Sequence, residues 1–137
     1  MLSRLVMNFL VLNKKSGAYN KRLHRNLEEL SEEFLEDGYK ICFTKPSNEL
    51  YMPDIEDHVS ENDTIIAVGG DGTVNICLNY IHKYNLQDKV SLGIIPRGTG
   101  NNMLLSLDLS RYLRKGFEII KKRKYQKLQY GVINKKY

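Results

Sequence analysis

Short apolar segments alternate along this chain with segments of helical periodicity. Strand-length apolar runs occupy Leu5–Leu12, Tyr39–Phe43, Thr64–Val68 and Ser91–Ile95. A run with as few polar interruptions as Leu5–Leu12 is typical of a strand that is covered on both faces of a parallel sheet. The alternation predicts an α/β fold, namely a three-layer, Rossmann-like parallel sheet with helices on both faces.

Three of the intervening segments have the spacing of an amphipathic helix. Their apolar positions are Leu23, Leu27, Leu30 and Phe34 in the first, Val74, Cys77, Leu78 and Ile81 in the second, and Leu113, Phe117 and Ile120 in the third. We expect Gly38 to end the first helix and Ser110 to cap the third.

Bulk composition limits the class of protein. The chain has 137 residues, of which 42% are hydrophobic and 27% charged, as expected for one globular domain. The net charge of +5 favours anionic partners without choosing among them. The apolar N-terminal run is short and has no cleavage site, and no run of about 18 apolar residues occurs, so we predict no signal peptide and no membrane span. Cys42 and Cys77 are expected to be buried apolar residues.

Two glycine-rich loops follow strand-like runs. Gly69-Gly70-Asp71-Gly72-Thr73 follows Thr64–Val68, and Pro96-Arg97-Gly98-Thr99-Gly100-Asn101-Asn102 follows Ser91–Ile95. In a parallel sheet both loops lie at the carboxyl ends of strands, where ligands bind. Glycines let backbone N–H groups approach phosphate oxygens, and a helix N-terminus beyond the loop adds donors. One such loop is often only a turn, but the pair predicts phosphate binding.

Asp71 is the unusual member of the first loop, because a carboxylate repels phosphate. It has three interpretations: a base for an incoming hydroxyl, a group linked to Mg²⁺, or a cap for the helix at Thr73–Asn75. The residues alone leave all three open.

Neither loop matches GxxxxGK[ST] or GxGxxG, so a Walker-type ATPase and a dinucleotide oxidoreductase are not supported. The two loops together resemble the diacylglycerol kinase catalytic-domain family, which includes bacterial lipid kinases and sphingosine kinases. NAD kinases share the first loop but differ in the second. The resemblance covers nearly the whole chain, since Asn13-Lys14-Lys15-Ser16-Gly17 is similar to the family's Asn-Pro-x-Ser-Gly loop and Thr44-Lys45-Pro46 to its threonine motif.

The resemblance implies an ATP-dependent lipid kinase domain that moves the γ-phosphoryl of ATP, with Mg²⁺, to a lipid hydroxyl, with diacylglycerol as the first expectation. It implies that Asp71 is the catalytic residue, because the matching aspartate of sphingosine kinase-like members is proposed as the base. No metal ligand is assigned. The implied nucleotide-binding residues are Asn13, Ser16, Gly17, Thr44, Gly69, Gly70, Asp71, Gly72, Thr73, Asn75, Gly98, Thr99, Gly100 and Asn101.

The sequence departs from the family pattern at three points. Lys14 replaces the usual Pro, and Asn102 stands where Asp is common, which removes a carboxylate that could act through Mg²⁺. Family members also continue into a β-rich domain that supplies the acyl-lipid pocket. We therefore expect residues 1–127 to form the nucleotide-binding domain and 128–137 to begin a truncated lipid-binding domain. The rival function is a non-catalytic module that binds nucleotide or a partner protein.

A basic group near the C-terminus has two interpretations, a solvated face or a surface that docks on anionic lipid. Its members are Arg111, Arg114, Lys115, Lys121, Lys122, Arg123, Lys124 and Lys127. The tyrosines do not cluster, which argues against nucleic-acid stacking. The expected partners are ATP and a lipid at a membrane surface, with no nucleic acid. The expected location is the cytoplasm; attachment to the inner membrane surface and a homodimer are left open.

Overall fold

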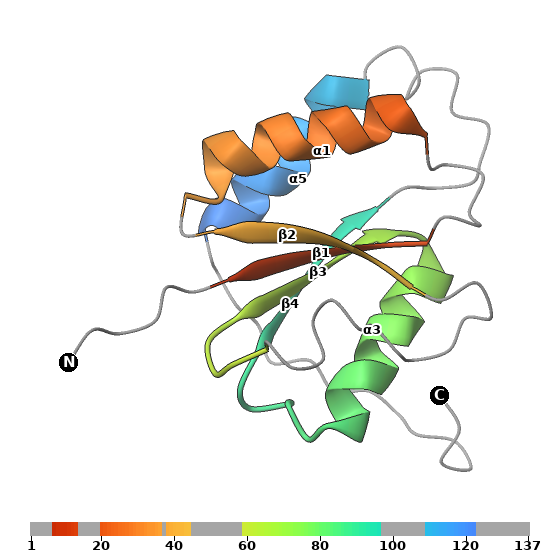
Figure 1. Cartoon of the computed structure of the whole chain (residues 1–137), viewed down its shortest axis with the longest axis vertical. Coiled ribbons are helices and arrows are strands. Elements are labelled where there is room, and N and C mark those ends of the chain that lie inside the picture. The colour runs from red at the N-terminus through yellow and green to blue at the C-terminus, as the bar shows by residue number, and fades with distance from the viewer. Residues whose placement is uncertain (1–6, 14–19, 37, 45–58, 97–108, 123–137) are drawn as a thin grey trace.

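The computed structural model describes residues 7–13, 20–36, 38–44, 59–96 and 109–122. Figure 1 shows these residues as three layers with the sheet in the middle. Helices α1 and α5 cover one face of the sheet, and α3 covers the other, which confirms the predicted α/β architecture. The elements are β1 (Asn8–Leu12), α1 (Lys21–Phe34), β2 (Tyr39–Phe43), β3 (Thr64–Gly69), α3 (Asp71–Lys83), β4 (Ser91–Pro96) and α5 (Leu109–Lys122).

The four described strands form one parallel sheet in the order β2-β1-β3-β4. β1 and β3 are central, and every residue of both is buried. Leu10 of β1 lies opposite Ile41 of β2 and Ile66 of β3, and Ile66 lies opposite Gly93 of β4. The near-continuous apolar runs of the sequence are therefore the two strands that are covered on both faces.

Each central strand contributes to two cores, because successive side chains point to opposite faces of a sheet. Leu10 and Leu12 pack beneath α1 and α5, whereas Phe9 and Val11 pack against α3. The α1/α5 core also contains Leu23, Leu27, Leu30, Ile66, Val68, Ile95, Leu113 and Phe117. The α3 core also contains Cys42, Ile65, Ala67, Cys77, Tyr80 and Ile81.

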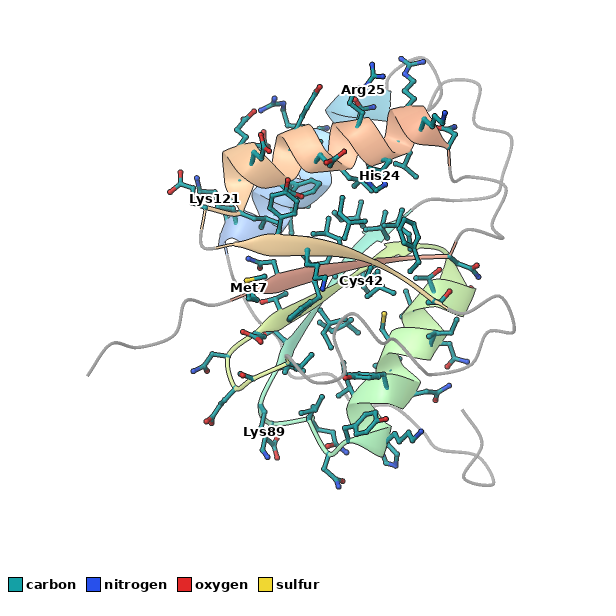
Figure 2. All side chains as sticks on the ribbon, in the orientation of Figure 1. Met7, His24, Arg25, Cys42, Lys89 and Lys121 are labelled. Atoms are coloured by element: carbon teal, nitrogen blue, oxygen red, sulfur yellow. The ribbon has the colours of Figure 1, made fainter. Side chains whose placement is uncertain are left out.

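Helix α1 begins at a side-chain cap and ends before the predicted glycine. Asn20 Oδ1 accepts a hydrogen bond from the Leu23 N–H at 2.8 Å. Leu35 is the C-cap, and its N–H donates to the Ser31 carbonyl at 2.8 Å, so Gly38 does not end the helix as predicted. Gly38 instead has φ +138° in the turn to β2, where its carbonyl accepts from the Asn8 backbone N–H and from Asn8 Nδ2. Figure 2 shows His24 on the sheet side of α1 and Arg25 on the outer side.

Two other predicted boundaries differ from the observed ones. The first strand was predicted from Leu5, but β1 begins at Asn8 and residues 1–6 lie outside the described part. Met7 precedes the strand because its N–H donates to a side chain, Asp63 Oδ1, instead of a neighbouring strand. Helix α5 begins at Leu109, so Ser110 lies inside the first turn and is not its cap.

Asp63 is fully buried where three strands begin. Its Oδ1 accepts from the Met7 N–H at 3.0 Å and its Oδ2 from the Ser60 N–H at 2.7 Å. Its carbonyl accepts from the Ser91 N–H at 3.1 Å. One residue therefore joins the starts of β1, β3 and β4, and it satisfies backbone donors that burial would otherwise leave unpaired.

Replacement of Asp63 by Ala should destabilise the fold by about 2–4 kcal/mol, because two partly buried N–H groups lose their side-chain acceptor. Asp63→Asn should cost less, since one acceptor oxygen remains. Urea denaturation measures both, and Glu61→Ala at a neighbouring exposed position is the control. Equal stability of the Asp63→Ala and Glu61→Ala variants would contradict this account of the strand starts.

Candidate functional site

The carboxyl ends of all four described strands lie at one edge of the sheet, because the strands are parallel. Asn13 follows β1, Thr44 follows β2, and Gly70 and Asp71 follow β3. Gly69 at the end of β3 lies opposite Pro96 at the end of β4. Three strand spacings of about 4.8 Å give this edge a width of roughly 14 Å. The fold thus brings together residues that are up to 83 positions apart in the sequence, from Asn13 to Pro96.

Thr44 is fixed at this edge next to the end of β1. Its N–H donates to the Leu12 carbonyl at 2.9 Å, which continues the pairing of β1 and β2 by one residue. The Thr44 side chain is 7% exposed, and its hydroxyl oxygen has no hydrogen-bond partner within the described structure. A buried hydroxyl without a partner is costly, and Thr44 Oγ1 shares this state with Ser31 Oγ and Thr64 Oγ1 elsewhere in the described structure.

The turn from β3 to α3 depends on Gly69. This residue has φ +157°, and a Cβ placed on it would lie 2.7 Å from Thr73 Oγ1. Thr73 is buried, so its side chain packs back against the loop. The fold itself therefore requires glycine at position 69, because the loop can close over Thr73 only when its first residue, Gly69, has no side chain.

The N-terminus of α3 has no side-chain cap. Its N-cap is the exposed Gly70, and the first intrahelical bond runs from the Val74 N–H to the Gly70 carbonyl at 3.2 Å. The N–H groups of Asp71, Gly72 and Thr73 therefore precede the first bond of the helical ladder. Asp71 is the first helical residue, so the prediction that it caps this helix is wrong. Its exposed carboxylate is near the positive end of the helix dipole, a favourable position for a negative charge.

Gly72 differs from Gly69 in what surrounds it. It is exposed in the first turn of α3, and a Cβ there would have no described atom within 4 Å. Glycine in a helix costs about 0.5–1 kcal/mol relative to alanine, and no described neighbour requires glycine at this position. Close approach of a ligand to the backbone at Gly72 would give that reason.

A surface hollow of about 390 Å³ lies beside this loop. Its described lining consists of Asp71, Gly72, Val74, Asn75 and Leu78, which all belong to α3. The hollow places the exposed carboxylate of Asp71 at one end and apolar side chains along the helix.

The structure describes only part of the predicted nucleotide site. Asn13, Thr44 and the residues from Gly69 to Thr73 lie at the carboxyl edge, with Asn75 one turn into α3. Ser16, Gly17, Gly98, Thr99, Gly100 and Asn101 lie outside the described residues. The sequence analysis did not predict that α1 has a side-chain cap and α3 does not. Asn20, which directly precedes the amphipathic segment of α1, was a signal for the cap of that helix.

The resemblance to lipid kinases implies Mg²⁺, and the loop after β3 can offer this ion one carboxylate. Among the described residues no group of three or more His, Cys, Asp and Glu side chains is arranged to hold a metal ion. Mg²⁺ at phosphate sites is usually held by one or two carboxylates together with phosphate oxygens. Asp71 can supply one carboxylate, so the described residues fit an ion that arrives with a nucleotide.

The basic group of α5 divides into tied and exposed side chains. Arg114 forms a two-pronged ion pair with Glu33 of α1, in which Nη2 donates to Oε1 at 2.9 Å, and it lies 5.4 Å from the centre of the Phe34 ring. The hydrogen bond from Arg114 holds the pKa of Glu33 below its usual value. Lys121 also lies over Phe34, at 5.7 Å. These two cations therefore fasten α5 to α1, whereas Lys115 and Lys122 are exposed.

Both cysteine thiols are buried, as predicted. Burial raises the pKa of the Cys77 thiol to about 12, and the neighbouring Cys42 adds to this shift. The Cys77 thiol is therefore protonated at neutral pH and is not a nucleophile.

Across the described residues, none of the helices has both the length and the apolar character needed to cross a membrane.

The two glycines of the loop should respond differently to alanine. Gly69→Ala should lower the free energy of unfolding by about 2–4 kcal/mol, from the contact with Thr73 and backbone strain. Gly72→Ala should leave stability unchanged or raise it by about 0.5–1 kcal/mol. Thermal and urea unfolding of the two variants test this; a Gly72→Ala protein as unstable as Gly69→Ala would show that the fold needs both glycines.

Comparison with known proteins identifies the family. The model of the "Diacylglycerol kinase catalytic domain" matches residues 8–133. The chain is 30% identical over 105 residues to "Probable lipid kinase YegS-like" of Cronobacter sakazakii, with 77% of this chain and 34% of that protein covered. It is 30% identical over 104 residues to the diacylglycerol kinase of Bacillus subtilis, covering 74% of this chain and 33% of that protein. The chain thus spans about a third of the length of these relatives.

A solved structure agrees with this assignment. It is a provisionally assigned diacylglycerol kinase from Bacillus anthracis strain Sterne, with a TM-score of 0.56 and 27% identity, covering 90% of this chain and 41% of that one. The family match extends over residues 8–133, so this chain belongs to the diacylglycerol kinase catalytic-domain family.

Proposed function

We propose that this chain is the nucleotide-binding part of a lipid kinase that transfers the γ-phosphoryl group of ATP to a lipid hydroxyl, with diacylglycerol as the first candidate. The observation that carries the proposal is the uncapped N-terminus of α3, which follows a glycine loop at the carboxyl edge of the sheet. Helix α1 provides a comparison within the same protein, because its N-terminus is closed by Asn20.

Phosphate oxygens are the natural partners of the α3 N-terminus. The N–H groups of Asp71, Gly72 and Thr73 need acceptors, and the helix dipole favours negative charge at this end. The exposed Gly72 leaves room for a phosphate against the backbone. Asn13, one strand away on the same edge, and Thr44, two strands away, contact the rest of the nucleotide, where the Thr44 hydroxyl, unpartnered within the described structure, gains a hydrogen bond.

Asp71 is the proposed base. The acceptor hydroxyl oxygen forms a bond to the γ-phosphorus while the bond from that phosphorus to the β–γ bridging oxygen breaks, and ADP leaves. The hydroxyl proton passes to the carboxylate of Asp71. The exposure of this carboxylate, and its position beside the donors that hold the phosphates, support this role. Mg²⁺ bound with the nucleotide would neutralise phosphate charge, and Asp71 is the described carboxylate that could also contact it.

Asp71→Asn in the full-length protein should reduce turnover by roughly 10²–10⁴-fold, the usual contribution of a positioned acid or base. Nucleotide affinity should change little, because backbone donors hold the phosphates. Transfer of labelled phosphate from ATP to diacylglycerol in mixed micelles measures turnover, and calorimetry measures affinity. Normal turnover in the Asn variant would remove Asp71 from the chemistry.

Gly72→Ala should abolish stabilisation of the chain by Mg–ATP without lowering its stability in the absence of ligand, because the new methyl group occupies the phosphate position. A ligand at 100 times its dissociation constant adds about 2.7 kcal/mol, which a thermal melt detects. Lys83→Ala, at the other end of α3, is the control and should keep the response. If Gly72→Ala responds to Mg–ATP as the wild type does, phosphate does not bind against this residue.

The rival function is a non-catalytic module that binds nucleotide or a partner. It deserves a direct test because the chain spans about a third of the length of its kinase relatives. A protein that is stabilised by Mg–ATP but transfers no phosphate to any of a panel of lipids would favour the rival. Transfer to one lipid of the panel would decide for the kinase and would name its substrate.

A further inference from the structure

Helix α1 carries its charges in an order that opposes its own dipole. Its first turn contains Lys21 and Arg22 and no acidic residue, and its last turn contains glutamates and no basic residue. The helix dipole favours the reverse, with acidic residues at the start and basic residues at the end. Helix α3 follows that rule, with Asp71 in its first turn and basic residues in its last, and α5 also ends in basic residues. The charge order of α1 therefore does not stabilise the helix.

We infer that the basic start of α1 is a surface that docks on an anionic lipid bilayer. The surface consists of the exposed side chains of Lys21, Arg22 and Arg25, which we call the α1 cation cluster. The choice of a bilayer as the partner rests on the proposed lipid kinase function, because such an enzyme takes its acceptor from a membrane.

The α1 cation cluster lies at the same edge of the sheet as the proposed nucleotide site. Near the start of α1, the ring of His24 stacks on that of Phe43, the last residue of β2, with 6.0 Å between the ring centres. Near the end of α1, Glu32 Oε1 accepts a hydrogen bond from the hydroxyl of Tyr39, the first residue of β2. Helix α1 therefore runs opposite to the strands, and its start lies over their carboxyl ends.

The three cations are available to an external partner. Each is exposed, and within the described residues none of them forms an ion pair with a carboxylate. Figure 2 shows Arg25 on the side of α1 that points away from the sheet. The cluster thus differs from Arg114 and Lys121 of α5, which contact Glu33 or Phe34 of α1.

The position of the cluster favours a bilayer over the nucleotide as the bound anion. The proposed phosphate position is the start of α3, and α3 covers the opposite face of the sheet from α1 (Figure 1). The sheet therefore lies between the cluster and the phosphates. A bilayer is an extended surface, so it can meet exposed cations on the outer side of α1.

The acidic half of the same helix orients the protein on such a surface. Glu28, Glu29, Glu32 and Glu36 are exposed beyond the cluster, toward the amino edge of the sheet. An anionic bilayer attracts the start of the helix and repels the rest. Docking therefore favours the orientation in which the carboxyl edge of the sheet, where Asp71 lies, is turned to the bilayer that holds the acceptor.

Matched removal of charge at the two edges of the sheet tests the inference. One variant replaces the α1 cation cluster through Lys21→Gln, Arg22→Gln and Arg25→Gln. The control replaces three exposed lysines near the amino edge, at the ends of α3 and α5 and before β4, through Lys83→Gln, Lys89→Gln and Lys122→Gln. Both variants lose three positive charges. Cosedimentation of the 137-residue chain with vesicles of phosphatidylcholine and phosphatidylglycerol measures docking, and vesicles of phosphatidylcholine alone are the reference.

The α1 variant should bind the anionic vesicles roughly 100-fold more weakly than the wild type, because each basic residue at the surface contributes about fivefold. The control should lose far less. The melting temperature of the α1 variant should be unchanged or higher, because the removed charges oppose the helix dipole. Should the triple variant fail to fold, Arg22→Gln alone is used, with an expected loss of about fivefold. Equal losses in the α1 variant and the control, or a wild type that does not prefer anionic vesicles, overturn the inference.

Nucleotide binding is measured separately on the same proteins, as thermal stabilisation by Mg–ATP. Both variants should keep the stabilisation seen in the wild type, because the proposed phosphate position is at the start of α3. Loss of this stabilisation in the α1 variant alone would assign the cations to the nucleotide and overturn the docking surface. A wild type that is not stabilised by Mg–ATP would instead contradict the proposed function, whatever its binding to vesicles.

Discussion

The buried carboxylate of Asp63 sets the start of three strands, and the site at the opposite edge depends on that alignment. Its two oxygens accept N–H groups from Met7 and Ser60, and its carbonyl accepts from Ser91. The next residue, Thr64, pairs with Asn8 on one side and Ser91 on the other. Because strands in register rise equally per residue, this fixes which residues meet at the far end: Ala67 meets Val11, and Gly69 meets Pro96. A slip of one residue would also turn the apolar side chains to the wrong core.

Gly69 and Gly72, in the loop after β3, differ in what a side chain at each position would meet. Gly69 is required for folding, since a side chain there would collide with Thr73. Gly72 has no described atom where a Cβ would lie, so its replacement by alanine is expected to give a small gain in stability. The starts of two helices differ as well. The Asn20 side chain caps the start of α1 and stabilises that helix, whereas the N-cap of α3 is Gly70, which has no side chain to do so.

Local patterns in the sequence predicted most of the framework. The leucines at 23, 27 and 30 identified α1 because a helical period is readable within one segment, and Tyr39–Phe43 matched β2 because its neighbours are turn residues. Contacts between distant residues could not be predicted in the same way. Asp63 and Met7 are 56 positions apart, and Arg114 and Glu33 are 81 apart. The residues around one partner therefore carry no local pattern that identifies the other partner. Asp71 is the first residue of α3 and not its cap, because the turn around Gly69 places the first helical hydrogen bond between the Val74 N–H and the Gly70 carbonyl.

The tied and exposed cations of α5 limit how the basic C-terminal group can act. Arg114 and Lys121 hold Phe34 and Glu33, so their charges belong to the contact between two helices. Arg114 and Lys121 take part in that contact although they are exposed, whereas Lys115 and Lys122 are exposed outside it. Each basic residue near an anionic membrane surface contributes about 1 kcal/mol, so the described part of α5 supplies only weak attraction.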